Sequence, residues 1–350
     1  MSAVPYLINK MKILIDIIHP AHVHFFRNAL SIWQSRGHEV AITAREKDVT
    51  ISLLNNYNLD YKLLSKSGKG SFALAKELIT RDFKLYQFCR TFKPDVLTGI
   101  SGYFISHIGK LIGKPSIIFD DTEHQTKGHK ITWPFATEIH SPDCYLKAPV
   151  KKQRLYKGFH ELAYLRPEYF TPDKEIVRSI GIDPDEKYCI VRMVSWQAHH
   201  DVGQSGFDAA KMADFLKELS RHARPYLSVE GDCPNSLKPY QLSIPVHQIH
   251  HVMAFASLCV GEGATMISES AVLGVPAVYI NTLKLGYINM LEEYGLVKQT
   301  TDTDLALQYG LDFLIEQNAR EKYQQIKQKL LNDKIDVTQY IVNRVESFSS

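Results

Sequence analysis

The sequence predicts an α/β protein built from two Rossmann-like domains. Short apolar runs alternate with longer amphipathic segments through the first half, and the same alternation restarts after a turn-rich, Pro-containing stretch at 158–173. This alternation is typical of βαβ units around a parallel sheet. A chain of 350 residues is long enough for two such domains. We expect one domain at 1–165 and a second, with closing helices, at 166–350, facing each other across a cleft that holds the ligand.

The first domain is expected to begin with a strand at 12–18, which opens within Met11–Ile15, and its last expected strand is the buried one at Pro115–Phe119. Gly37 ends the first helix, and Pro94 ends a long helix that starts at Ser71. Strands are expected at 12–18, 38–43, 61–64, 95–98 and 115–119, and helices at 22–36, 48–57, 71–92 and 103–112. We expect residues 1–10, which precede the first strand, to be an extension or a misassigned start.

The second domain repeats the pattern, with Pro276 opening a buried strand and Gly274 ending the helix before it. Strands are expected at 188–194, 225–230, 243–246, 258–261 and 277–280. Helices are expected at 208–222 and from about 303 to 343.

Composition excludes several classes of protein. Apolar residues make up 45% and charged residues 23%, as in folded globular proteins, and a net charge of +3 gives no field that attracts nucleic acid. The five cysteines are scattered, which is typical of reduced thiols and not of a zinc site. No apolar run approaches the roughly 20 residues that span a bilayer. We expect a cytoplasmic protein that binds no nucleic acid and needs no metal or other cofactor.

The most informative segment is 260–280, where a strand ends in a Gly-rich turn that leads into a helix. Such a turn leaves the first N–H groups of the helix unpaired, and those groups bind phosphate. We expect the turn to bind a nucleotide diphosphate and Glu269, one turn into the helix, to bind the ribose hydroxyls. The turn residues are Gly261, Glu262, Gly263, Ala264 and Thr265. The alternative is an ordinary helix–strand corner.

Three histidines, His19, His22 and His24, occupy the first βα loop and the start of its helix. Histidine titrates near neutrality and can take a proton from a sugar hydroxyl. We expect His22 to act as general base or to bind the acceptor hydroxyl, with His19 beside it. The alternative is that these side chains make hydrogen bonds at the helix start or pack in the cleft wall. No acidic residue stands at metal-ligand spacing from these histidines, so we do not expect three of these side chains to bind a metal ion.

Acidic residues follow the strand at 115–119 directly. Asp121 and Glu123 are candidates for a general acid/base or for binding sugar hydroxyls. The alternative is a solvated turn that caps the next helix.

The loop after the first strand of the second domain starts at Arg192. We expect Arg192, with the loop residues Ser195, His199 and His200, to hold the donor diphosphate, and Gly231 to line the base pocket through its backbone. Ordinary turn and helix-start contacts are the alternative.

The segment 62–93 is basic, with eight Lys or Arg residues against two acidic ones, a net +6. A basic amphipathic helix with aromatic residues suits an anionic membrane surface or a lipid-diphosphate acceptor. The alternative is a solvated outer helix.

Several of these motifs together resemble a known superfamily. They are Ile18–His24, Arg36–Val40, Lys93–Val96 and Gly99–Tyr103, and the spacing of Gly263, Ala264, Glu269, Gly274 and Pro276. The chain resembles the GT-B superfamily, and in particular the peptidoglycan UDP-GlcNAc transferase and the non-hydrolysing UDP-GlcNAc 2-epimerase. More narrowly, it is similar to a bacterial and archaeal GT-B-like family of unknown function.

The resemblance implies a metal-independent glycosyltransferase that uses a nucleotide-diphosphate sugar such as a UDP sugar. Its acceptor would be a glycan or a lipid-linked molecule, used in surface polysaccharide or envelope glycan synthesis at the inner membrane face. Pro20 and Ala21 replace glycines of the transferase loop, which argues against acceptor diphosphate binding there. A nucleotide-sugar 2-epimerase and a non-catalytic nucleotide-sugar-binding protein are the alternatives. This chain lacks the epimerase sequence His-Arg-Arg-Glu-Asn, which weakens the epimerase alternative.

Overall fold

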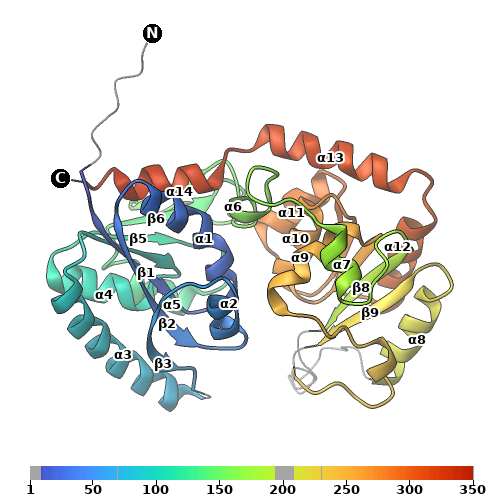
Figure 1. The fold of residues 1–350 in the computed structure, drawn as a ribbon, viewed down its shortest axis with the longest axis horizontal. Coiled ribbons are helices and arrows are strands. Elements are labelled where there is room, and N and C mark those ends of the chain that lie inside the picture. The colour runs from blue at the N-terminus through green and yellow to red at the C-terminus, as the bar shows by residue number, and fades with distance from the viewer. Residues whose placement is uncertain (1–8, 69, 194–208, 230, 350) are drawn as a thin grey trace, which may run out of the picture. The chain divides into compact units, whose positions relative to one another are not determined.

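A computed structural model describes residues 9–68, 70–193, 209–229 and 231–349. The chain forms two compact units (Figure 1). Unit 1 contains the chain up to Tyr164 and takes it up again from Ile335, and unit 2 is Leu165–Lys334. The expected second domain, 166–350, differs from this division in its last residues, because the final helix packs on unit 1.

Unit 1 is built on a parallel sheet of seven strands, which confirms the α/β class. Every neighbouring pair of strands is parallel, and Ile15 lies between Ile42 and Thr98. The order is β3 (Lys62–Lys66), β2 (Glu39–Glu46), β1 (Lys12–Ile17), β4 (Val96–Ile100), β5 (Ser116–Phe119), β6 (Glu138–Pro142) and β7 (Gln153–Tyr156). The central strands are buried, as expected for a sheet with helices on both faces.

The helices of unit 1 enclose this sheet. Trp33, Phe25 and Phe26 of the first helix are fully buried. That helix begins after His19 with Pro20 at its first position and ends before Gly37, whose φ of +83° is left-handed. The helices are α1 (Pro20–Ser35), α2 (Thr50–Asn56), α3 (Ser71–Phe92), α4 (Tyr103–Ile112), α5 (Thr126–Thr132) and α14 (Val337–Glu346), with α6 (Leu162–Leu165) at the boundary.

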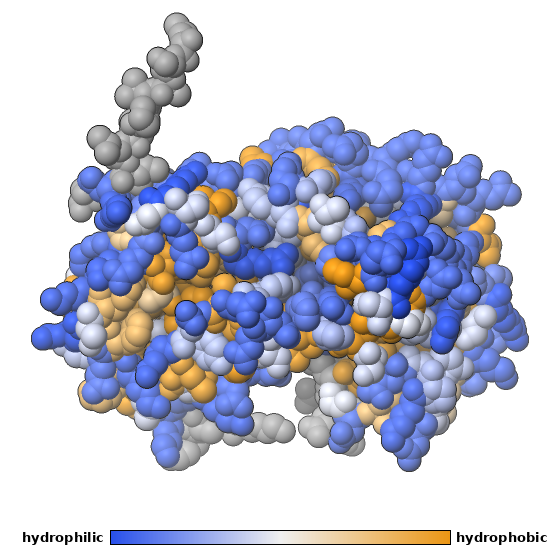
Figure 2. Space-filling view, in the orientation of Figure 1, coloured by the Kyte–Doolittle hydropathy of each residue, from blue (hydrophilic) through white to orange (hydrophobic). Residues whose placement is uncertain are grey.

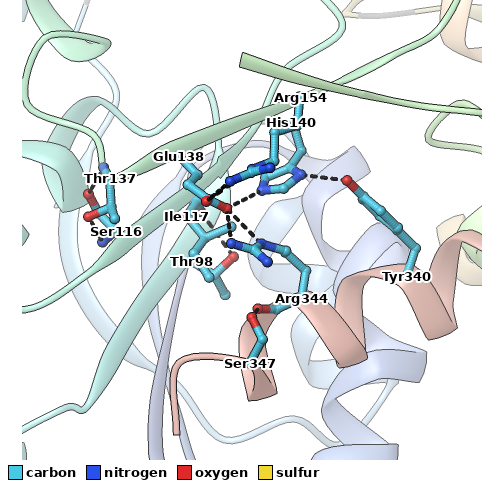
Figure 3. A network of polar contacts seen from close by, with 10 residues as sticks. All are labelled: Thr98, Ser116, Ile117, Thr137, Glu138, His140, Arg154, Tyr340, Arg344 and Ser347. Atoms are coloured by element: carbon cyan, nitrogen blue, oxygen red, sulfur yellow. Dashed lines mark hydrogen bonds and ion pairs between the residues drawn. The ribbon is translucent and has the colours of Figure 1, made fainter. Parts of the chain in front are cut away.

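A polar network attaches α14 to the sheet of unit 1 (Figure 3). The Glu138 carboxylate of β6 binds Arg154 of β7 at 2.9 Å and Arg344 of α14 at 2.5 Å. His140 lies between Glu138, at 3.2 Å, and the Tyr340 hydroxyl, at 2.7 Å. Burial lowers the pKa of His140 to about 4, so its imidazole is neutral at pH 7. The last helix is therefore part of the unit 1 core.

Unit 2 has a parallel sheet of five strands. The order is β12 (Val297–Thr300), β11 (Ala277–Ile280), β10 (Leu258–Gly261), β8 (Tyr188–Met193) and β9 (Arg224–Val229). Its helices are α7 (Lys174–Ser179), α8 (Ala209–Leu219), α9 (Ile249–Phe255), α10 (Ala264–Val272), α11 (Gly286–Glu293), α12 (Thr303–Ile315) and α13 (Ala319–Asp333). The strand expected at 243–246 is wrong. Pro245 supplies no N–H for a ladder, and a short 3₁₀ helix, Val246–Gln248, follows it.

The surface of unit 1 carries exposed apolar side chains on α3. Figure 2 shows hydrophobic areas on this unit among mainly hydrophilic surface. Leu74, Ile79 and Phe83 are 47%, 72% and 61% exposed. Arg81 is one of the eight basic residues of 62–93, but its side chain is buried, so it adds no charge to the surface of this segment. Within the described ranges, no helix is long and apolar enough to cross a membrane.

Candidate functional site

The strand order of unit 2 places a topological switch point at the carboxyl ends of β8 and β10. The chain passes from β8 to β9 on one side and returns to β10 on the other, so connections leave these two neighbours in opposite directions. Open α/β sheets bind ligands at such a switch point. Arg192 pairs with Gly261 in the β8–β10 register, so both predicted donor-binding segments begin at this point.

Gly261 is required by the close approach of these strands. A Cβ at this position would lie 2.7 Å from both the Cβ and the carbonyl oxygen of Arg192. The turn then continues to Gly263, which precedes α10, and none of the described side chains caps the start of that helix. The first N–H groups, including those of Ala264 and Thr265, therefore remain available for an anion.

Glu269 lies on α10 and is only 7% exposed. Its Oε1 accepts a hydrogen bond from His250 Nε2 of α9 at 2.9 Å. The His250 contact fixes the carboxylate one turn from the open helix start. The pairing of His250 with Glu269 is a contact that sequence reasoning missed.

The other predicted donor-binding residues are placed as follows. Arg192 Nη1 donates to Ser228 Oγ at 2.9 Å, and Asn281 Nδ2 donates to the Glu262 carbonyl at 3.0 Å. Gly231 follows β9 with a left-handed φ of +89°. Ser195, His199 and His200 lie outside the described residues.

The strand order of unit 1 places a second switch point at the carboxyl ends of β1 and β4, which are neighbours. The histidine loop follows β1 directly. His19 Nδ1 accepts the Ala21 N–H at 3.3 Å, and His22 Nδ1 accepts the Ile18 N–H at 3.4 Å. In each neutral ring the other nitrogen, Nε2, then holds the proton.

Burial keeps both rings uncharged. It lowers the pKa of His19 to about 4, with a further contribution from Lys47, and it holds the pKa of His22 well below its usual range. A ring whose Nε2 holds the proton donates a hydrogen bond and is a poor base. Of the two roles expected for His22, this geometry favours binding of a hydroxyl or anion over proton abstraction.

Asp121 has a histidine partner that sequence reasoning missed. Its Oδ2 lies 3.0 Å from His160 Nδ1, and its Oδ1 accepts from the Thr122 hydroxyl at 3.1 Å. Burial opposes ionisation of both groups, but their mutual attraction exceeds it, so the pKa of Asp121 is lowered and that of His160 is raised. The Asp121 side chain is 16% exposed and therefore reachable.

Asp120, next to it, is fully buried and has a different environment. His129 Nε2 of α5 lies 3.2 Å from its Oδ1, which also accepts the Thr122 N–H at 3.1 Å. Burial raises the pKa of Asp120 in spite of these partners. Adjacent carboxyl groups with pKa values displaced in opposite directions are typical of acid/base sites.

Glu123 makes contacts that favour a structural role. It is 4% exposed and accepts the Leu146 N–H at 3.4 Å, while Lys147 Nζ donates to its carbonyl oxygen. These bonds hold the loop between β6 and β7. Among the described residues, no cluster of three or more His, Cys, Asp or Glu side chains is arranged to hold a metal ion.

Known proteins resemble this chain at the level of family and fold. Residues 11–349 match the model of a family described as "Protein of unknown function (DUF354)". An uncharacterized protein of Methanocaldococcus jannaschii is 24% identical over 326 residues, covering 87% of this chain and 92% of that protein.

Solved structures share the fold at low identity. The UDP-GlcNAc 2-epimerase of Neisseria meningitidis, bound to UDP-GlcNAc, has a TM-score of 0.65 at 12% identity, covering 96% of this chain and 99% of that one. The glycosyltransferase of kitacinnamycin has a TM-score of 0.61 at 14% identity, covering 97% and 99%. The shared architecture of two parallel α/β units is the GT-B fold.

Proposed function

The chain belongs to the DUF354 family, and on this premise we propose that it is a metal-independent glycosyltransferase-like enzyme that uses a nucleotide-diphosphate sugar. The observation that supports this most directly is the uncapped start of α10 at the switch point of unit 2. The Neisseria epimerase of the same fold was solved with UDP-GlcNAc, which supports a UDP sugar as donor.

Unit 2 supplies the donor-binding groups in this proposal. The turn Gly261–Thr265 binds the diphosphate through its N–H groups, and Arg192 adds a positive charge beside Gly261. Both contacts strengthen as negative charge accumulates on the departing diphosphate, so they stabilise the transition state more than the ground state. Glu269 accepts hydrogen bonds from the ribose hydroxyls.

Unit 1 supplies the acid/base groups. Asp121 is the reachable carboxylate and accepts the proton of the acceptor hydroxyl, with His160 as its positioning residue. His22 and His19 donate hydrogen bonds to the acceptor or the sugar through Nε2.

A nucleotide-sugar 2-epimerase is the second candidate. The opposite pKa displacements of Asp120 and Asp121 favour it, because epimerisation needs an acid and a base on one sugar. The complete burial of Asp120 favours transfer instead, because a fully buried carboxyl group is not accessible to a sugar. A non-catalytic nucleotide-sugar-binding protein is the remaining alternative.

We further propose a role in surface polysaccharide or envelope glycan synthesis on the cytoplasmic side of the membrane. The exposed Leu74, Ile79 and Phe83 of α3, with Lys76 and Lys84 nearby on the same helix, support a peripheral contact with an anionic bilayer through 62–93.

The proposal is tested by thermal unfolding against a panel of nucleotides and nucleotide sugars without added metal. A ligand at 100 times its dissociation constant stabilises the folded chain by about 2.7 kcal/mol. The sugar nucleotide that shifts the transition is then incubated with the enzyme. Product from the nucleotide sugar alone indicates epimerisation, product only with an acceptor indicates transfer, and binding without turnover that Asp121→Asn does not alter indicates a binding protein. A flat panel would contradict the donor site.

A further inference from the structure

Unit 1 contains a cavity of about 460 Å³ between α5 and the loop that joins β6 to β7. This volume is within the range of small-molecule sites. Its apolar lining consists of Trp133, Pro134, Ile139, Tyr145, Ala148 and Val150. Ile139 and Tyr145 are buried and form its interior, whereas Val150 is 47% exposed.

Three polar atoms of this lining are buried without a hydrogen-bond partner in the described part of the chain. They are the Tyr145 hydroxyl, Trp133 Nε1 and His129 Nε2, the last of which lies 3.2 Å from Asp120 Oδ1 without a hydrogen bond to it. The Tyr145 side chain is 8% exposed, and burial raises its pKa, so the hydroxyl keeps its proton. A buried donor is normally paired with protein, water or a ligand, so an acceptor group of a ligand in this cavity would satisfy these donors.

The charged residues that line the cavity are all positive. Four lysines, Lys130, Lys147, Lys151 and Lys152, contribute to the lining, and none of the lining residues is acidic. Lys152 Nζ donates to the carbonyl oxygens of Pro134 and Ala136, both at 2.8 Å, and Lys147 Nζ donates to that of Glu123. Neither contact is with a carboxylate, so the positive charge is not neutralised.

We propose that this cavity binds an amphiphilic anion, with an apolar chain against Trp133, Ile139 and Val150 and an anionic head at the lysines. The Tyr145 hydroxyl donates to the head group. An apolar wall selects against a free anion, and the lysines select against a neutral lipid.

The cavity adjoins the acid/base groups. His129 lines it and lies 3.2 Å from Asp120, the residue before Asp121. A long-chain phosphate bound here would present its head close to the carboxylates, so we identify the cavity as the acceptor site. This assignment rests on the proposed function, and it narrows the acceptor to a lipid-linked anion.

The test is calorimetric titration of the full chain with farnesyl monophosphate, farnesol and inorganic phosphate, each below its aggregation limit. Farnesyl monophosphate should bind at least tenfold more tightly than either fragment. Ala148→Trp, which fills the cavity from an exposed position, should weaken binding at least tenfold, and Lys130→Ala with Lys151→Ala should weaken it to a similar extent. Lys127→Ala, on the same helix but outside the lining, is the matched control and should leave affinity unchanged.

Equal affinity for inorganic phosphate would identify an anion site only, and equal affinity for farnesol an apolar site only. Either result, or unchanged binding by Ala148→Trp, would overturn the proposal. The nucleotide panel is run on the same Ala148→Trp protein and should be unaffected. If nucleotides raise the unfolding temperature but farnesyl monophosphate does not bind, the cavity proposal and its acceptor assignment fail, and the donor site stands. The reverse pattern would support the cavity and contradict the donor site.

Discussion

Replacing Glu269 by Gln tests the ribose contact with little change to the fold. The carboxylate is buried, and its Oε1 accepts from His250 at 2.9 Å. A Gln carbonyl oxygen still accepts that bond, so we expect the free energy of unfolding without ligand to change by less than about 1.5 kcal/mol. The amide group, however, places a donor where one carboxylate oxygen would accept a ribose hydroxyl.

The size of the effect follows from the charge of the lost acceptor. A hydrogen bond to a charged group contributes about 1.5–3 kcal/mol, which corresponds to a roughly 10- to 150-fold weaker dissociation constant. At a nucleotide concentration 100 times the wild-type dissociation constant, the stabilisation falls from about 2.7 to about 0.4 kcal/mol if affinity drops 100-fold. For a unit of this size, the ligand-induced shift in Tm should fall from about 5–11 °C to about 1–2 °C.

The assay is thermal unfolding of both proteins over a nucleotide titration. Glu292→Gln on α11 is the matched control, because its carboxylate also has a protein partner in unit 2, accepting from Gln299 at 3.0 and 2.8 Å. It should leave the nucleotide-induced shift unchanged. An equal shift for wild type and Glu269→Gln would refute the ribose assignment.

Asp16→Asn and Arg81→Met should each destabilise unit 1 by about 3–5 kcal/mol in urea unfolding, because each leaves one charge of a buried 2.5 Å pair without its partner. A double variant that is no less stable than either single variant would support this ion pair. Strictly additive losses of stability would contradict it. In the wild type, the free energy of unfolding should fall as pH rises from about 6.5, the ordinary histidine pKa, to the raised pKa of His160 in the folded state. In His160→Gln this fall should be absent. Thermal unfolding between pH 5 and 9 measures this, and an unchanged profile would contradict the Asp121–His160 pair. Gly261→Ala should cost about 1–3 kcal/mol in unit 2 and weaken nucleotide binding, since its Cβ would collide with the adjacent strand; wild-type binding would rule out the close approach.

The pH dependence of the Asp121–His160 pair has a definite sign. The lowered pKa of Asp121 stabilises the fold above about pH 3.8, its ordinary value, and this is lost as pH falls through the folded pKa. The raised pKa of His160 stabilises the fold below about pH 6.5, and this is lost as pH rises through the folded pKa. The pair therefore contributes most between these two values.

Local sequence patterns determined the α/β class, the strands next to the sites and the Gly-rich turn before α10. These features depend on side chains a few residues apart: the apolar period, and Gly37 and Gly274 at helix ends, where φ is left-handed. The first helix was expected from residue 22, whereas it begins at Pro20. The sequence missed β6, β7 and β12. Glu138, His140 and Arg154 interrupt the apolar pattern of the first two strands, and β12 is four residues long with Lys298 and Gln299 at its centre.

Only the tertiary structure decided which distant residues meet. His160 lies 39 positions after Asp121 and His250 lies 19 positions before Glu269, so no local period could pair them. The same holds for α14, which joins unit 1 through Arg344 and Glu138 although 206 positions separate them. Strand order, and with it the position of both switch points, depends on long-range pairing. The sequence therefore identifies the reactive side chains that each loop carries, whereas tertiary packing determines which of those side chains contact one another.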